Sequence, residues 1–327
     1  MTTFQKPGYG SGNGDASFTF LFPDPGLLAK LERMSVAGGS RITGTLAGKR
    51  RSTSLGGSQE FADYRPYAPG DDVRRIDWNV YGRTGKPFLR QFWDEQELHV
   101  HLYIDASESM SGFGGERFNK LTYALRLAAS VGYAALCGGD RLSVKRFTAD
   151  WMDDGLRMAT GRASALQLFR YLAKDRVASG AAESTSISGN DFSDLSKPFR
   201  GSGSLPRRAG ASWLITDAWY ERGIEETLLA LKSAGQHVVL VQVLSPEELD
   251  PKLDGELRLI DAELGTSKEV ALSAGSLRNY RDALRAYQEE LRRICANKGI
   301  PFVSVDTSQP LSDTIARLAT IPNTLKL

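Results

Sequence analysis

One stretch of the chain combines a buried apolar pattern with oxygen-bearing side chains at fixed spacing. Residues 98–104 alternate apolar side chains and carry no charge, which predicts a strand covered on both faces. The strand ends at Asp105, and Ser107 and Ser109 follow at intervals of two. In open parallel sheets, ligands bind beyond the carboxyl ends of the strands. One carboxylate and two hydroxyl groups are hard oxygen donors suited to Mg²⁺, so these three residues are candidate metal ligands.

A second apolar run ends in the same way. Residues 212–216 have the character of a buried strand, and Asp217 follows them directly. If both runs belong to one parallel sheet, Asp105 and Asp217 converge on one hydrated divalent cation. The alternative is that each carboxylate only caps backbone N–H groups of the segment that follows it.

The rest of the chain beyond residue 110 alternates between helix and strand patterns. Apolar residues recur at helical spacing in long segments, and short apolar runs separate these segments. This alternation predicts an α/β fold, with a mostly parallel sheet, right-handed crossovers and flanking helices. The predicted helices are 116–136, 164–174, 225–234, 277–297 and 311–318, and the further strands are 141–147, 237–243 and 301–305.

Composition argues against several classes of protein. No apolar run reaches membrane-spanning length, and the Gly- and Ser-rich residues 1–17 lack the apolar core of a secretory signal. We expect residues 1–17 to be a disordered tail. The two cysteines, Cys137 and Cys295, both fall in helical patterns, which favours a cytoplasmic setting without a disulfide framework. A net charge of +2 indicates neither a nucleic-acid nor a membrane partner.

Residues 61–92 are dense in aromatic and charged side chains and follow no simple period. A Pro-Gly turn, a brief helix at 73–78 and a strand at 88–93 predict a small β-rich arm, too small for a core of its own and therefore packed on the rest of the chain. The charges nearly cancel, which favours internal ion pairs; the alternative is a surface that binds nucleic acid by base stacking. The candidate partner-binding residues are Arg65, Arg74, Arg75 and Arg83.

Two other groups of polar residues receive structural interpretations. Residues 245–270 are rich in aspartate and glutamate, and we expect a hairpin insertion that is the acidic counterpart of the arm's arginines. His99, His101 and His237 have no clustered cysteines or carboxylates beside them. We therefore expect them to be packing residues in adjacent strands rather than a metal triad.

Three segments carry a resemblance to a known family. They are YRPYAPGDDVRRIDW from Tyr64, RTGKPFLRQF from Arg83 and DASESM from Asp105. With them the chain resembles the bacterial domain-of-unknown-function family 58 (DUF58), whose members are similar to von Willebrand factor A domains. The resemblance implies a von Willebrand A-like (Rossmann-like) domain at residues 96–327, preceded at 18–95 by an N-terminal helix and the arm. The pattern D-x-S-x-S at 105–109 then matches a metal-ion-dependent adhesion site.

The resemblance also implies a further metal ligand, a threonine in a turn within residues 177–203. Asn190 stands at the matching position, and an asparagine carbonyl can ligate a hard cation; Thr185 or Ser186 are alternatives. The cofactor implied is Mg²⁺, with Mn²⁺ or Ca²⁺ as alternatives. The full candidate ligand set is Asp105, Ser107, Ser109, Asn190 and Asp217.

The function implied by the resemblance is that of a non-catalytic interaction protein. It would work with a MoxR-type AAA+ ATPase in the assembly or maturation of client proteins, and the metal would keep one position open for a partner's carboxylate. The enzyme alternative is metal-dependent phosphoryl transfer with Asp105 as nucleophile, although such enzymes usually have a second aspartate where Ser107 stands. A nucleic-acid-binding module is the third hypothesis and rests on the arm and the basic triplet at 49–51.

Overall fold

The structure is a computed structural model and describes residues 14–38, 51–55, 61–95, 97–112, 118–174, 193–251, 255–260, 267–272 and 274–326. Contacts divide the chain into two compact units. The larger unit consists of Met1–Ala37 together with His99–Leu327, and the smaller unit is Gly38–Leu98. We describe each unit by itself.

The larger unit is built on a six-stranded sheet with the strand order β12-β9-β8-β5-β6-β7. All neighbours pair in parallel except the edge strand β7, which is antiparallel to β6. The mixed α/β fold with a mostly parallel sheet is therefore as predicted. The strands are β5 (His99–Asp105), β6 (Arg141–Phe147), β7 (Leu156–Thr160), β8 (Gly210–Thr216), β9 (Gln236–Leu244) and β12 (Phe302–Asp306).

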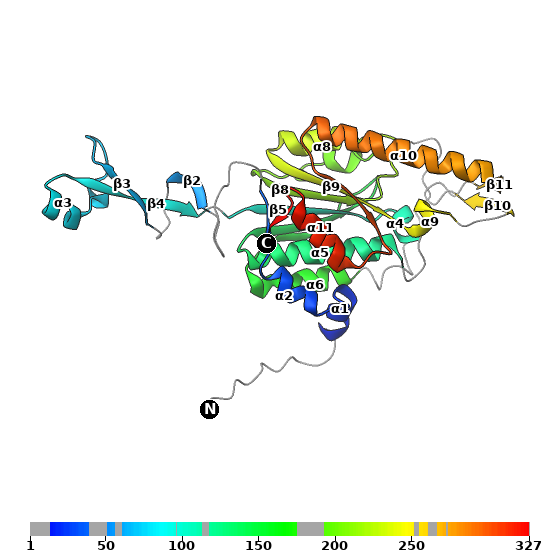
Figure 1. Cartoon of the computed structure of the whole chain (residues 1–327), viewed down its shortest axis with the longest axis horizontal. Helices are drawn as coiled ribbons and strands as arrows, with labels where there is room; N and C mark the ends of the chain where they lie inside the picture. Colours follow the sequence, from blue (N-terminus) through cyan, green and yellow to red (C-terminus); the bar gives the residue numbers. More distant parts are fainter. Residues whose placement is uncertain are drawn as a thin grey trace, which may run out of the picture. The chain divides into compact units, whose positions relative to one another are not determined.

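Helices lie on both faces of this sheet (Figure 1). The central helix α5 (Lys120–Cys137) packs on β5 and β6, and it is buried over most of its circumference because further helices cover its outer side. On the opposite face, α8 (Ile224–Ser233) packs on β9 and α10 (Ala274–Asn297) on β12. The helices on the α5 side are α1 (Gly14–Leu21), α2 (Gly26–Leu31), α6 (Ala165–Ala173) and α11 (Leu311–Thr320).

The two central strands end side by side. In β5 and β8 every residue after the first is buried, as expected for strands covered on both faces. Their parallel register pairs Ile104 with Ile215, so Asp105 and Thr216 come next at the same edge of the sheet. This register brings the two polar strand ends together.

The smaller unit contains a three-stranded antiparallel sheet in the order β2-β4-β3, made of β2 (Arg51–Leu55), β3 (Phe61–Pro66) and β4 (Phe88–Glu95). The turn after β3 leads into the short helix η1 (Val73–Arg75) and then α3 (Trp78–Thr84), which ends at Gly85 in a left-handed conformation. The antiparallel strand of the arm is confirmed. Of the helix predicted at 73–78, Val73–Arg75 is helical, whereas Ile76 and Asp77 are extended and Asp77 caps α3, which was not predicted. That the arm packs on the larger unit stays a prediction.

Shorter elements complete the larger unit. α4 (Glu108–Gly112) follows β5, η2 (Arg162–Ser164) precedes α6, and η3 (Lys197–Arg200) precedes β8. α9 (Pro246–Leu249) precedes the antiparallel hairpin of β10 (Gly255–Ile260) and β11 (Ser267–Leu272), which confirms the predicted insertion. β1 (Ser35–Val36) pairs with β13 (Leu325–Lys326). None of the helices in the described part of the chain is both long and apolar enough to cross a membrane.

Candidate metal centre

Asp105 lies at the carboxyl end of β5 and is completely buried. Its Oδ2 atom accepts a hydrogen bond from the Thr216 hydroxyl group at 2.5 Å, and its Oδ1 atom accepts one from the Tyr220 hydroxyl group at 3.1 Å. Desolvation is the main cause that raises the pKa of Asp105 to about 7, and the negative charge of Asp217 adds to it. The buried carboxylate is therefore short of positive charge.

Ser107 and Ser109 lie beside this carboxylate at the start of α4. The Ser107 backbone N–H donates to Asp105 Oδ1 at 3.0 Å, and the Ser107 and Ser109 Oγ atoms are 3.0 Å apart. Ser107 is buried and Ser109 half-buried. The capping interpretation of Asp105 is thus realised, and the same turn brings two hydroxyl oxygens next to each other in the spacing that a cation could use.

Asp217 follows β8 and is also completely buried, but its partner is a lysine. Lys120 Nζ donates to Asp217 Oδ2 at 2.8 Å and to Glu248 Oε1 at 2.5 Å. The Lys120 side chain has no exposed surface at all, and a buried ammonium group is tolerated only when carboxylates and hydrogen bonds compensate it. Sequence reasoning missed Lys120; the available signal was a basic residue at the start of an otherwise apolar helical pattern.

Glu248 is held in place by its own short helix. It forms a capping box with Ser245, in which the Ser245 N–H donates to Glu248 Oε2 at 2.8 Å. The Trp219 indole N–H donates to Glu248 Oε1 at 3.0 Å, and the Trp219 backbone N–H donates to Asp217 Oδ1 at 3.1 Å. Sequence analysis paired the acidic segment 245–270 with the arm's arginines; for Glu248 this was wrong, because its charge is compensated by the internal Lys120.

The donor set fits a hard divalent cation. Within the described residues there is no group of three or more His, Cys, Asp or Glu side chains that could hold a metal. A Mg²⁺ site needs only one or two carboxylates, with neutral oxygens and water for the rest, and Asp105 with the two serine hydroxyls meets that need. Asp217 is near enough for its charge to act on Asp105. The candidates Asn190, Thr185 and Ser186 lie outside the described residues.

Thr216 and Tyr220 were not among the predicted site residues. Both donate to Asp105, from the end of β8 and from the segment just after it. Thr216 also accepts the backbone N–H of Ala218, whose positive φ of 63° marks a sharp turn at this point. These contacts orient the Asp105 carboxylate.

The candidate arginines of the arm are divided between internal pairing and exposure. Arg65 forms a two-pronged ion pair with Asp71, at 2.6 and 2.8 Å. Arg90, which was not a candidate, pairs with the buried Asp77 at 2.7 Å, and this bond together with the Tyr64 hydroxyl lowers the pKa of Asp77. Internal pairing of the arm's charges therefore holds for these two arginines.

The remaining arginines of the arm, Arg74, Arg75 and Arg83, are exposed and form no ion pair within the described part of the chain. Beside them, the rings of Trp78 and Tyr81 meet edge to face at 6.0 Å, and Trp78 is 63% exposed. An exposed aromatic and basic surface of this kind is typical of an interaction site. Its role as a partner surface stays a prediction.

The larger unit is thus an open α/β domain whose carboxyl sheet edge carries carboxylate and hydroxyl groups. The chain belongs to the family described as "Protein of unknown function DUF58", whose model matches residues 63–291. An uncharacterized protein of Mycobacterium tuberculosis is 27% identical over 295 residues, which cover 90% of this chain and 89% of the relative.

Two solved structures are similar in fold at lower identity. BatB from Bacteroides thetaiotaomicron, a conserved hypothetical protein, is 20% identical with a TM-score of 0.39, covering 67% of this chain and 96% of that one. An aerotolerance-related membrane protein from Bacteroides fragilis is 16% identical with a TM-score of 0.38, covering 67% and 97%.

Proposed function

We propose that this chain is a non-catalytic, metal-dependent interaction module that acts as an adaptor for a MoxR-type AAA+ ATPase in the assembly or maturation of client proteins. The observation that carries the proposal is the meeting of Asp105, Ser107 and Ser109, with Asp217 nearby, at one edge of the sheet. The family resemblance supplies the class of ATPase. The proposed setting is the cytoplasm.

Each residue of the site has a defined part in this proposal. Asp105, Ser107 and Ser109 would hold Mg²⁺, and Thr216 and Tyr220 orient the Asp105 carboxylate through their hydroxyl groups. Bound Mg²⁺ supplies a position for a carboxylate of the partner. Lys120 carries one positive charge between the carboxylates of Asp217 and Glu248, and so it reduces the negative charge that an anionic ligand of the partner would meet.

The surroundings of Asp105 favour metal ligation over catalytic turnover. A nucleophilic aspartate has to reach its substrate, whereas the Asp105 carboxylate is buried and accepts bonds from Thr216, Tyr220 and Ser107. Asp217, the other carboxylate of the site, is tied to a lysine and to a backbone N–H. Phosphoryl transfer is therefore the alternative to the proposal, and an assay of phosphate-ester hydrolysis tests it.

Asp105→Asn is expected to weaken Mg²⁺ binding by about 100-fold or more, because it removes the charge of the buried carboxylate beside the serine hydroxyls while keeping the size of the side chain and its place in the fold. Calorimetric titration of Mg²⁺ or Mn²⁺ into both proteins measures this loss. Asp306→Asn is the matched control, since Asp306 ends another strand of the sheet and accepts the Ser308 N–H at 2.8 Å. Equal heats of Mg²⁺ binding for the wild type and for Asp105→Asn would contradict a metal site at Asp105.

The adaptor part of the proposal requires a separate test. The chain is expected to co-purify with a MoxR-type ATPase of its own host when Mg²⁺ is present, and the complex is expected to be lost with chelator and with Asp105→Asn. A complex that survives both treatments would show that the metal face is not the interface. Hydrolysis of a fluorogenic phosphate ester that disappears with Asp105→Asn would replace the adaptor with the enzyme hypothesis.

A further inference from the structure

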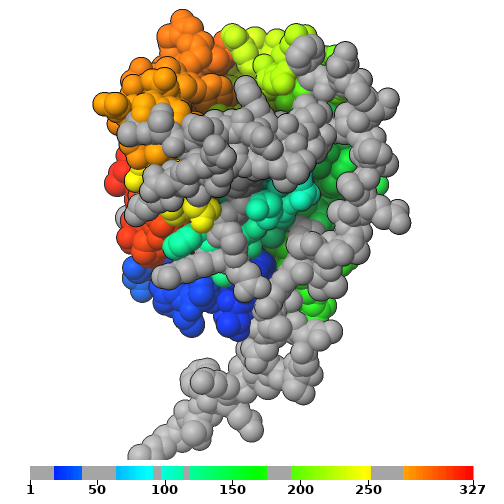
Figure 2. All heavy atoms as spheres, turned by 90° about the vertical axis from the view of Figure 1, so that its right-hand side faces the viewer, coloured from blue at the N-terminus to red at the C-terminus, as the bar shows by residue number. Residues whose placement is uncertain are grey.

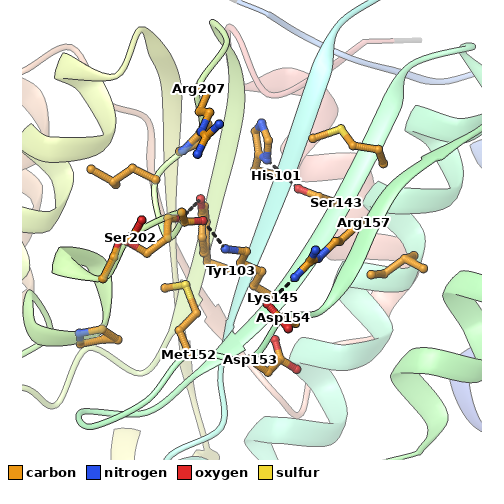
Figure 3. A pocket seen from close by; sticks show the side chains of 18 of the residues that line it. His101, Tyr103, Ser143, Lys145, Met152, Asp153, Asp154, Arg157, Ser202 and Arg207 are labelled. Carbon is orange, nitrogen blue, oxygen red and sulfur yellow. Dashed lines mark hydrogen bonds and ion pairs between the residues drawn. The ribbon is translucent and has the colours of Figure 1, made fainter.

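A second cavity lies on the sheet face opposite α5, over β5, β6 and β7. Its volume is about 720 Å³, which is within the range of sites for small organic ligands. The floor comes from side chains of β5 and β6, one wall from residues 150–158, and the other from the segment around residues 197–208 (Figure 3). All of these residues belong to the larger unit. We call this cavity the sheet-face cleft.

The floor of the sheet-face cleft contains a buried polar atom without a partner. His101 is 7% exposed, and its Nδ1 atom lies 2.6 Å from the Oγ atom of Ser143 in the paired strand. Within the described part of the chain, no group makes a hydrogen bond to its Nε2 atom. Burial is the main cause that lowers the pKa of His101 to about 4, so the ring is neutral at pH 7.

His101 and Ser143 make the floor polar, and they contact each other. The Nε2 atom of His101 is buried below the surface of the cleft. The contacts open to a ligand therefore come from the charged side chains around the floor.

The lining of the sheet-face cleft has more basic than acidic side chains. Of its three acidic residues, Asp153 is bonded to Arg146 outside the lining, and Asp154 pairs with Arg157, which leaves Asp150. Arg207 and Arg208 are exposed and form no ion pair within the described residues. The basic lining residues are Arg141, Lys145, Arg157, Lys197, Arg207 and Arg208.

The wall that carries these arginines is fixed to the floor. Lys145 Nζ donates to the carbonyl oxygen of Gly203 at 2.7 Å, and the buried Tyr103 hydroxyl group donates to that of Ser204 at 3.0 Å. Ser204 Oγ lies 2.6 Å from the carbonyl oxygens of Phe199 and Gly201. The loop is therefore held in one conformation by buried groups, as a preformed binding site requires. Figure 3 shows His101, Lys145 and Arg207 around the cavity.

We propose that the sheet-face cleft binds the phosphate groups of a small molecule, with Arg207 and Lys145 as the donors. Arginine presents several N–H groups in a planar fork, and such charge-assisted bonds to phosphate are stronger than neutral ones. The indole of Trp151, 46% exposed at the wall, offers a flat apolar surface next to the cations. The phosphate groups can therefore belong to a nucleotide, with its base stacked on Trp151, or to free polyphosphate.

The test is calorimetric titration of ADP, tripolyphosphate and adenosine into the full chain, in chelator so that no metal bridges the phosphate. ADP is expected to bind and adenosine not to bind. Arg207→Gln is expected to weaken ADP binding by about 10-fold to 100-fold, the loss typical of one charge-assisted hydrogen bond. Arg285→Gln is the control, because Arg285 is exposed on α10 away from the lining.

Further variants test which molecule supplies the phosphate and whether the cleft binds it independently of the metal centre. If the ligand is a nucleotide, Trp151→Ala is expected to weaken the binding of ADP but not that of tripolyphosphate. If the ligand is free polyphosphate, ADP and tripolyphosphate are expected to bind with equal affinity, and Trp151→Ala is expected to change neither affinity. Asp105→Asn is expected to leave binding unchanged. Failure of both ADP and tripolyphosphate to bind at millimolar concentration, or equal affinity in Arg207→Gln, would overturn the proposal.

Discussion

Lys120→Met is expected to lower the free energy of unfolding by about 3–5 kcal/mol, which is the loss found when one partner of a buried ion pair is removed. Methionine has a similar unbranched length and can fill the volume of the lysine stem. The Asp217 carboxylate would then stay buried, opposite Glu248, without the ammonium group that now lies 2.8 Å from it. Urea unfolding at neutral pH in chelator measures the change.

Two further variants separate the charge effect from packing. Lys298→Met removes an ion pair with Glu225 whose carboxylate is 51% exposed, and it is expected to cost less than about 1 kcal/mol. Combining Lys120→Met with Asp217→Asn and Glu248→Gln removes all three of these charges and is expected to recover most of the lost stability, because neither carboxylate is then left without its ammonium partner. A loss of unfolding free energy for Lys120→Met as small as that for Lys298→Met would show that the fold does not depend on the buried ion pair.

The strand pattern was sufficient to predict where the polar strand ends meet. Residues 98–104 and 212–216 carry no charge, and such runs favour strands inside a covered parallel sheet. The consequence, Asp105 near Asp217 at one edge, requires that both strands run in the same direction and lie side by side, as they do. For this reason the fold and the position of the site could be inferred from local sequence.

The partners of these carboxylates could not be inferred in that way. Lys120 contacts Asp217 and Glu248, which are 97 and 128 positions further along the chain. A helical pattern shows which face is apolar, but it contains no information on which distant side chains meet a residue at the end of the helix. Thr216 was likewise read as part of a strand, although its hydroxyl group is what binds Asp105.

The histidines show a similar limit. His99 and His101 were expected to be packing residues, and their rings do stack, with centroids 6.4 Å apart. His237, expected in an adjacent strand, lies on β9, and β8 separates it from β5. The order of strands in a sheet depends on long-range pairing rather than on local pattern. Consequently the polar floor of the sheet-face cleft, where two histidines face a serine, was visible only in the structure.

Gly155→Ala is expected to cost about 3–4 kcal/mol of unfolding free energy, a value at the upper end for a single substitution. Gly155 immediately precedes β7, with φ of +62°, a conformation that itself costs an alanine about 1–2 kcal/mol. A Cβ atom there would also lie 1.9 Å from the carbonyl oxygen of Val144 in β6. Neither the backbone at Gly155 nor the backbone at Val144 can move away without separating the edge strand β7 from β6.

Gly299→Ala isolates the first of these causes, the positive φ. Gly299 also has φ of +62°, but a Cβ atom there would meet nothing within 4 Å, so only the conformational cost of about 1–2 kcal/mol is expected. Urea unfolding of both variants gives the cost of the clash as their difference, and equal losses would contradict it. Because residues 150–158 form one wall of the sheet-face cleft, Gly155→Ala is also expected to weaken phosphate binding there, whereas Gly299→Ala should leave it unchanged.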